Sequence, residues 1–556
     1  MTNLKDLFIG IFLVLLSISA NAQLVKRAKV DELAALCKVW GFMKYYHPNV
    51  AKGLINWDSV LIEHIPNVEA ARNKKEFETV ILRVINSAGE IPPCDTCKIK
   101  TDSMITFIDW SWIENVSNNT GIKSILKKLR SFKAYAPNVY ITNIGPGGYV
   151  MSFPRITEQP YKEMQLPDRN YRLLSLFRIW NIIDYFFPYK NMMDIKWETT
   201  LKKFIPLFIS ADDTVQYHLV CKEFMTYLND GHSYSSSQPS NKLFYTYRVP
   251  FKIEYAEGKY LVGKSTNDSL FALSGLQTGD IIETVDGQSV QQRKQYLSKY
   301  FGGSNKIAIE GVEIANVLLN SADSTGSITI TRNGKKVIKK LNRYQRRTIQ
   351  QATAATKEPM WKKISSDIGY VHMGLLTKRD TIKYLFDDLQ KTKTIILDFR
   401  DYPSFSVIHE FLSYLYKENK PFAKFLSPVM EKPGYFIPNE GDFVFMQPKL
   451  NTYKGKIILL VNEHSGSLGE FFPMALQTLK NTITIGSQTW GADGNQVGTV
   501  LPGEIYVGFS GLGVSYPDGT ICQRKGIKID KIVKPTIKGI MEGRDELLEA
   551  AIKLVE

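Results

Sequence analysis

A serine that could act as a nucleophile stands between a strand pattern and a helix pattern in "VNEHSGSLGEFFPMALQ", residues 461–477. The residues "GKIILLVNE" (455–463) predict a buried strand, and apolar periodicity predicts a helix over about 469–480. Ser467 is expected in the turn between them, where unpaired N–H groups of the helix start could hold an oxyanion, notably that of Leu468. A simple helix cap is the structural alternative for this serine.

A serine hydroxyl is a weak nucleophile until a base takes its proton, so the seven histidines are the next candidates. His464 lies three residues before Ser467, and a turn could bring the two together. Five others fall in helix or strand patterns where packing or sheet surface is expected: His47, His64, His218, His372 and His409. The histidines show no metal-ligand spacing, so we expect no metal and no cofactor.

The seventh histidine, His232, belongs to a duplicated segment. "ALCKVWGFMKYYHP" (35–48) aligns without gaps on "SLFRIWNIIDYFFP" (175–188). The same offset of 140 residues places residues 55–66 on 195–206. Apolar residues recur at helical spacing in both copies, which predicts two similar helical modules.

The two copies differ at their ends. The second ends in "YLNDGHSYSS" (227–236), whereas the first has "VINSAGEIPP" (84–93), without a histidine. This asymmetry makes His232 a candidate functional residue. The stretch between the copies, 98–165, is predicted to form strands and loops.

Two further regions follow the helical copies. Residues 245–345 alternate short strands with turns, and "SGLQTGDIIETVDGQSV" (274–290) resembles a PDZ domain, a fold that binds an extended peptide at a sheet edge. From about residue 357, strands such as "DIGYVHMG" (367–374) alternate with helices, which predicts a layered α/β domain. The chain is therefore expected to be a multidomain α/β protein with helical N-terminal modules, a PDZ-like β domain and an α/β core.

The first residues predict export. Lys5 precedes an apolar run of about ten residues and the small-residue pattern Ala20-Asn21-Ala22, whereas a spanning helix needs roughly 20 apolar residues. We expect a cleaved signal peptide and a periplasmic or extracellular protein, with an uncleaved anchor as the alternative. The expected divisions are 1–22 signal peptide, 23–165 N-terminal module, 166–243 second helical module, 244–346 PDZ-like domain and 357–556 α/β core.

Composition excludes several classes of protein. The chain is 44% hydrophobic and 22% charged, which is typical of globular proteins. Its net charge of +15 is dispersed, with "NRYQRR" (342–347) as the densest cluster, so a solvated basic surface is expected and nucleic-acid binding is not. The close pair in "CDTC" (94–97) is interpreted as a local disulfide, although a redox pair and half a zinc site have the same spacing.

The segment around Ser467 resembles the nucleophile segment of the tail-specific, or C-terminal-processing, serine peptidases. In that family a buried strand ends in Val-Asn and Ser-x-x-Glu opens a helix, which Ser467 and Glu470 match and Ser465 does not. The resemblance covers roughly 166–556 and includes "IGSQTWGADG" (485–494). It implies a ClpP/crotonase-like peptidase core, and peptides or protein tails as substrates.

The resemblance also implies which base acts. The bacterial branch uses a lysine in a Gly-Lys-Gly turn, and this chain has Ala492 in the corresponding "TWGADG". The tricorn-like branch uses a histidine in an Asp-Gly-His pattern ahead of the PDZ domain, and this chain has Asp230-Gly231-His232 there. His232 is therefore the expected general base, and the chain is placed on the tricorn-like side.

Two positions depart from the family. Gln523 stands where a glutamate that orients the histidine is expected, and Asp493, Asp230, Ser233 and Gln496 are other candidates for that role. The loop "RDYPSFS" (400–406) replaces Asn-x-Gly-Gly, and Pro403 lacks the N–H that could help bind an oxyanion. The expected function is an exported serine endopeptidase without a cofactor. The alternative, from another class, is a non-catalytic peptide-binding or scaffold protein of the envelope.

Overall fold

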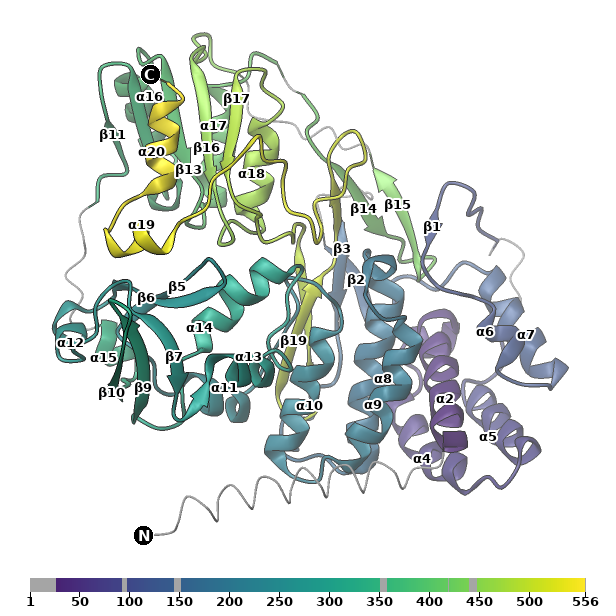
Figure 1. Ribbon diagram of the computed structural model, residues 1–556. Helices are drawn as coiled ribbons and strands as arrows, with labels where there is room; N and C mark the ends of the chain where they lie inside the picture. Colours follow the sequence, from purple (N-terminus) through teal and green to yellow (C-terminus); the bar gives the residue numbers. More distant parts are fainter. Residues whose placement is uncertain are drawn as a thin grey trace.

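The structure is a computed structural model that describes residues 27–92, 98–144, 152–350, 358–418, 420–439 and 448–555. The predicted signal peptide (1–22) and the Cys94–Cys97 pair lie outside these residues. Three regions follow one another in space: the helical modules, a β domain, and a layered α/β region above it (Figure 1). Among the described residues, no helix has both the length and the apolar character needed to cross a bilayer.

The two helical copies repeat almost residue for residue. Helices α4 and α5 of the first copy correspond to α9 and α10 of the second, at the same offset of 140 residues at both ends. The helices are α2 (Arg27–Tyr46), α4 (Trp57–Ala70) and α5 (Lys74–Asn86), then α8 (Arg169–Phe186), α9 (Trp197–Ser210) and α10 (Thr214–Thr226). Short helices α3 (Pro48–Ala51) and η1 (Lys190–Met192) follow α2 and α8.

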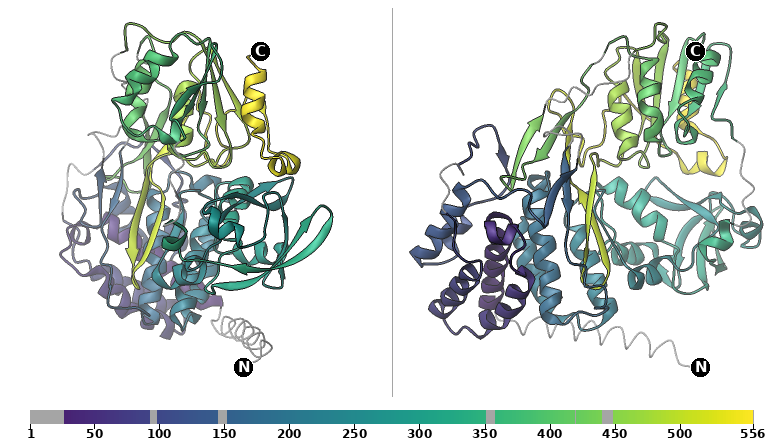
Figure 2. Two further views of the ribbon diagram at one scale, coloured as in Figure 1. Left: turned by 90° about the vertical axis from the view of Figure 1, so that its left-hand side faces the viewer. Right: turned by 180° about the vertical axis from the view of Figure 1, so that it is seen from behind.

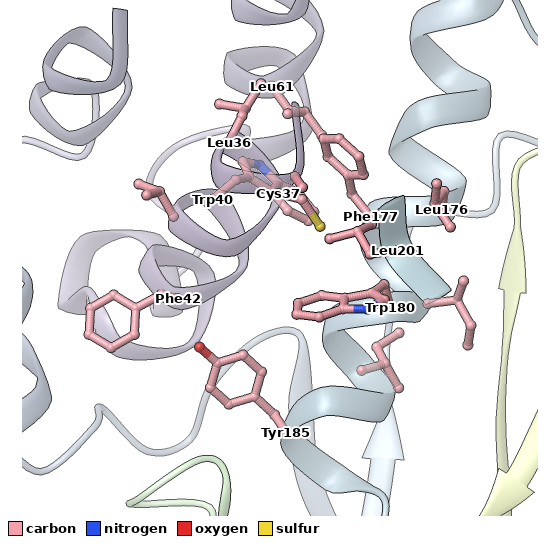
Figure 3. Close-up of a cluster of buried hydrophobic side chains, with 14 of the residues drawn as sticks. Leu36, Cys37, Trp40, Phe42, Leu61, Leu176, Phe177, Trp180, Tyr185 and Leu201 are labelled. Carbon is pink, nitrogen blue, oxygen red and sulfur yellow. The ribbon is translucent and has the colours of Figure 1, made fainter. Parts of the chain in front are cut away.

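A pair of tryptophans holds each copy together. Trp40 and Trp57 each donate their indole N–H to the other's backbone carbonyl, at 2.8 and 2.9 Å. Trp180 and Trp197 repeat this exchange in the second copy, at 3.0 Å in both directions. Side chains of α2 and α8, with Phe177 among them, meet in one buried cluster between the copies (Figure 3). The predicted duplication is thus a duplication of packing.

The prediction of only strands and loops between the copies is wrong in part. Strands β1 (Ile105–Thr106), β2 (Ile141–Ile144) and β3 (Phe153–Ile156) are present, but so are helices α6 (Trp112–Asn115) and α7 (Thr120–Ser131). Asn119 caps α7 by accepting the N–H groups of Gly121 and Ile122. Ile122, Leu126 and Leu129 bury one face of α7, at the i, i+4, i+7 spacing of an amphipathic helix.

The β domain is an antiparallel sheet in the order β10-β9-β7-β6-β5, with β8 paired to β7. Asp286 and Gly287 have φ of 51° and 78°, so the Asp-Gly turn predicted from sequence forms the β7–β8 hairpin. The strands are β5 (Phe251–Ala256), β6 (Lys259–Ser265), β7 (Ile281–Val285), β8 (Gln288–Ser289), β9 (Thr325–Arg332) and β10 (Lys335–Asn342). The helical elements are α11 (Gln238–Tyr245), α12 (Asp268–Ala272), α13 (Val290–Leu297), the π-helix η2 (Ala308–Ile314), α14 (Ala315–Val317) and α15 (Arg346–Gln350).

The α/β region has a six-stranded sheet in the order β11-β12-β13-β16-β17-β21, in which only the pairing of β11 with β12 is antiparallel. On β16, Ile457, Leu459 and Val461 face the core shared with α16, α17 and α18, whereas Ile458 and Leu460 face α20. The strands are β11 (Trp361–Lys363), β12 (Ile368–His372), β13 (Thr394–Asp398), β16 (Lys456–Val461), β17 (Thr482–Gly486) and β21 (Lys531–Ile532). The helices are η3 (Met373–Leu375), α16 (Thr381–Leu389), α17 (Phe405–Ser413), α18 (Leu468–Leu476), α19 (Ile537–Met541) and α20 (Glu546–Lys553). Helices therefore cover both faces of the sheet, and the region is the layered α/β domain that the alternation of strands and helices predicted.

Two small sheets join the regions. Strand β4 (Tyr234–Ser236), which follows the second helical copy, pairs with β19 (Ile505–Ser510), which in turn pairs with β18 (Gln496–Leu501). A second sheet links β1 to β15 (Tyr435–Asn439), β14 (Lys424–Pro428) and β20 (Gly513–Ser515). Both views of Figure 2 show β18 and β19 running from the α/β region along the helical modules. This pairing brings the end of α10 to the α/β region.

Candidate active site

Ser467 occupies a strained turn between β16 and α18. Its backbone has φ 53° and ψ −120°, a conformation that favours glycine, and its side chain makes no hydrogen bond to cap the helix. Such strain in a non-glycine residue costs about 1–3 kcal/mol and persists only where the surroundings enforce it. Here the Ser467 N–H donates to the carbonyl of Ala492 at 2.9 Å. The cap interpretation therefore does not account for this serine.

Glu470 holds the loop that faces the turn. Its carboxyl is fully buried and accepts the hydroxyl of Thr489 at 2.5 Å and the N–H groups of Gly491 and Ala492 at 2.7 and 3.0 Å. Burial raises its pKa to about 7, against which these three hydrogen bonds act. The Ser-x-x-Glu spacing thus connects the serine turn to the "TWGADG" loop, in which Ala492 bonds to both Ser467 and Glu470.

The backbone at the start of α18 offers an oxyanion donor. The N–H of Leu468 makes no hydrogen bond within the part of the chain that the structure describes, whereas that of Gly469 donates to Gly466 at 2.9 Å. Pro403 lies over this turn, because a Cβ added to Gly469 would stand 3.7 Å from its Cδ. The N–H of Leu468 is therefore unpaired among the described residues, and Pro403 contributes no N–H beside it.

His232 lies just before β4 and is buried, with 7% of its surface exposed. Its Nδ1 lies 2.9 Å from the hydroxyl of Ser510, and its carbonyl accepts the side-chain amide of Gln496 at 2.9 Å. Burial is the main influence on its imidazole and lowers its pKa, while the charge of Asp230 acts in the opposite direction. The neutral, proton-accepting form is thereby favoured near neutral pH.

The turn of Ser467 and the loop of His232 share two neighbours. The ring of Trp490 meets the ring of His232 edge to face at 6.0 Å and packs so closely on Gly466 that a Cβ there would lie 2.2 Å from Cε3. Ala492, which accepts the Ser467 N–H, touches Gly231. Between the described residues there is no hydrogen bond from Ser467 to His232. The structure therefore brings the turn of Ser467 and the loop of His232 to the same two residues, Trp490 and Ala492.

Of the five residues named as candidates to orient His232, Gln523 and Asp493 lie nearby, but neither bonds to the imidazole among the described residues. Gln523 donates its amide to Asp230 Oδ1 at 2.9 Å. Asp493 Oδ1 accepts the N–H of Gly494 at 2.7 Å, and burial raises its pKa well above the ordinary value. Sequence reasoning missed the side chain that does contact Nδ1, Ser510. Its only signal is strand register: Gly508 pairs with Tyr234, and two further steps along both strands place Ser510 opposite His232.

His464, the rival base, is exposed, and its backbone N–H bonds to the side chain of Asn462 at 3.0 Å. No hydrogen bond links it to Ser467 in the described parts of the chain. His372 Nε2 lies 3.2 Å from Asp401 Oδ2, and this hydrogen bond raises its pKa. Across the described ranges, no group of three or more His, Cys, Asp or Glu side chains could hold a metal ion.

A mostly parallel sheet delivers a strained serine to a helix start, and a buried histidine contacts the same tryptophan as the serine turn. This is the kind of arrangement found in serine-type peptidases. Residues 367–533 match the sequence profile of Peptidase family S41, and the chain therefore contains an S41 peptidase domain. This segment includes Ser467 and Ser510. His232 lies upstream of it.

Two relatives extend the similarity. Tricorn protease from Thermoplasma volcanium is 24% identical over 258 residues, a match that covers 44% of this chain and 22% of that protein. The chain thus spans about a fifth of the length of this relative. The crystal structure of mature CPAF superposes with a TM-score of 0.56 at 15% identity, over 70% of this chain and 97% of that one. Mature CPAF complexed with lactacystin gives a TM-score of 0.55 at 14% identity, over 70% and 98% of the two chains. The multidomain α/β fold is therefore shared well beyond the matched segment.

Proposed function

We propose that this protein is an exported serine endopeptidase in which Ser467 is the nucleophile and His232 the general base. The observation that carries the proposal is the strained, uncapped Ser467 at the start of α18. A serine whose hydroxyl serves neither the helix nor the core has no structural reason to adopt this conformation. The proposal also rests on the S41 domain that contains it.

The reaction follows from these positions. Ser467 Oγ attacks the scissile carbonyl carbon, and His232 Nε2 takes the hydroxyl proton. The N–H of Leu468 holds the resulting oxyanion, and the protonated imidazole then gives its proton to the leaving amine. Water attacks the acyl-enzyme by the same sequence of proton transfers. The direct bond between Ser467 and His232 is expected to form in the substrate complex, because such bonds are commonly long without substrate.

The β domain is proposed to hold the substrate's extended segment, as a PDZ domain would. Two of its residues reach the active-site loops: Ser304 Oγ accepts the N–H of Gly231 at 2.6 Å, and Asn305 donates to the carbonyls of Thr489 and Trp490, both at 3.0 Å. Substrate on this domain would therefore be carried beside Ser467. Export is proposed from the N-terminal sequence alone.

A second candidate, a non-catalytic peptide-binding protein, is favoured by Pro403. This residue lies over the start of α18 where relatives of the predicted family have glycines whose N–H groups help bind the oxyanion. If no other N–H replaces them, the site would bind a peptide and cleave it poorly.

Labelling with a fluorophosphonate probe separates the two candidates. The wild-type protein should become labelled, and Ser467→Ala should not. His232→Gln should lose labelling, whereas His464→Ala should keep it, because His464 is exposed and makes no bond to Ser467 among the described residues. Equal labelling of wild type and Ser467→Ala, or none of either, would refute the peptidase proposal.

A further inference from the structure

We infer that Ser510 and Asp230 form a relay that positions His232, in place of the acidic residue expected at Gln523. This inference rests on the proposed function, because it assigns a task to groups behind the proposed base. His232 Nδ1 lies 2.9 Å from Ser510 Oγ, and Ser510 Oγ lies 2.8 Å from Asp230 Oδ1. All three side chains are at least nine-tenths buried. Ser510 is thus a positioning residue and not a group that touches the substrate.

Asp230 is fixed as a hydrogen-bond acceptor. Its Oδ2 accepts the N–H of Ser510 at 2.7 Å, and its Oδ1 accepts the N–H of His232 at 3.2 Å, the Ser510 hydroxyl and the Gln523 amide. Acceptance at every contact is the role of an ionised carboxylate. Ser510 must therefore donate its one hydroxyl proton to Asp230.

The direction of that hydrogen bond sets the tautomer of His232. Because the Ser510 proton points at Asp230, the oxygen of Ser510 has only lone pairs to offer Nδ1. Nδ1 must then carry the proton of the neutral imidazole, which leaves the lone pair on Nε2. Nε2 is the atom that has to accept the proton of Ser467. When it does, the charge of the imidazolium is stabilised through Ser510 by the buried carboxylate.

Gln523 suits this arrangement better than a glutamate would. Its Nε2 lies 2.9 Å from Asp230 Oδ1 and donates to it. A glutamate oxygen at the same point would place two buried carboxylates in contact, which like-charge repulsion opposes. The departure from the family at Gln523 is therefore matched by a carboxylate at Asp230, so an acidic group is still present behind the histidine.

The test uses full-length Ser510→Ala and Ser510→Thr, with Ser413→Ala as a matched control. Ser413 is also buried, but among the described residues its hydroxyl bonds only to the carbonyl of Glu410 at 2.7 Å, within α17. Two quantities are measured. One is the rate of fluorophosphonate labelling of Ser467 against pH. The other is the tautomer and titration of His232 from ring 15N NMR signals, assigned by their loss in His232→Gln.

If the relay operates, the wild-type imidazole is protonated on Nδ1, and Ser510→Ala shifts it toward the other tautomer. The rate of labelling on the high-pH plateau should fall about 10- to 100-fold, which is part of the rate increase that general base catalysis provides. Its pH midpoint should move lower, because the imidazolium loses its acceptor. Ser510→Thr keeps a hydroxyl and should restore much of the rate, and Ser413→Ala should match wild type. A purely structural role for Ser510 would lower the labelled fraction without moving the midpoint.

The outcomes separate the two inferences. Wild-type labelling with an unchanged rate and midpoint in Ser510→Ala would overturn the relay and leave the peptidase proposal intact. Absence of labelling in wild type would overturn the peptidase, and the NMR tautomer would then decide the relay alone. If Ser510→Ala does not fold, the tautomer of His232 in wild type and in Ser510→Thr still decides the relay. A wild-type imidazole protonated on Nε2 would overturn it, and an imidazole protonated on Nδ1 in both proteins would support it.

Discussion

The backbone strain at Ser467 predicts that the Ser467→Gly variant is more stable than the Ser467→Ala variant. Ser467 has φ 53° and ψ −120°, and its hydroxyl makes no capping bond. Ser467→Ala removes the hydroxyl but keeps the Cβ, and hence the strain. Ser467→Gly removes both. The difference between the two variants isolates what the Cβ costs in this turn.

The magnitude follows from two opposing effects. Relief of a strained non-glycine conformation contributes about 1–3 kcal/mol. The greater freedom of glycine in the unfolded chain subtracts roughly 0.5–1 kcal/mol. Ser467→Gly should therefore be more stable than Ser467→Ala by about 1 kcal/mol. For a domain of roughly 200 residues this corresponds to an increase in Tm of about 2–4 °C.

Differential scanning calorimetry of the full chain measures this difference. Ser175 provides the control, since it lies within α8 and is also fully buried. There Ser175→Gly should be less stable than Ser175→Ala by about 1 kcal/mol, the ordinary cost of glycine in a helix. Both Ser467 variants should fail to react with a fluorophosphonate. If Ser467→Gly is less stable than Ser467→Ala, as in the control pair, the turn is not strained and the reasoning is wrong.

Two further predictions concern Glu470 and the repeated tryptophans. With its pKa raised to about 7, Glu470 supports the fold most below pH 4.5, and this contribution, about 3 kcal/mol, is lost as pH rises through about 7. Between pH 5 and pH 8, the Tm of Glu470→Gln should therefore fall less than the Tm of wild type, although the amide of Gln cannot accept every hydrogen bond that Glu470 accepts. If the two proteins show the same pH dependence of Tm, the assigned pKa is wrong. Trp57→Phe and Trp197→Phe should each cost about 2 kcal/mol in denaturant unfolding, because each removes a buried indole hydrogen bond to the carbonyl of Trp40 or Trp180 and part of a buried ring. A cost confined to one copy would show that the duplicated contacts are not equivalent.

Much of the fold follows from local sequence pattern. Apolar periodicity and the offset of 140 residues identify both helical copies, and alternating strands and helices identify the α/β region. Helix α7 was missed, since its signals, an Asn119 cap and one apolar face, lie in a stretch interpreted from its flanking strand patterns. The helical insertion formed by η2 and α14 (residues 308–317) was also not predicted within the β domain.

The candidate site, too, is predicted from the sequence in part and decided by the tertiary structure in part. The sequence alone places Ser467 between a buried strand and a helix. It also shows that only the second helical copy ends in a histidine, His232. Strain at Ser467 depends on how Ala492 of the "TWGADG" loop bonds to Ser467 and Glu470, and nothing local in the sequence specifies it. The predicted nucleophile, base and oxyanion donor remain predictions that labelling will test.

The partner of His232 was decided only in three dimensions. Sequence named Gln523, with Asp493, Asp230, Ser233 and Gln496 as alternatives, and could not choose among them. The pairing of β4 with β19 instead places Ser510 against the imidazole, across 278 residues of chain. A hydrogen bond of that range depends on the register of two strands from different regions, and register is set by the packing of whole elements. Sequence determined the residues capable of chemistry; tertiary structure decided which of them touch.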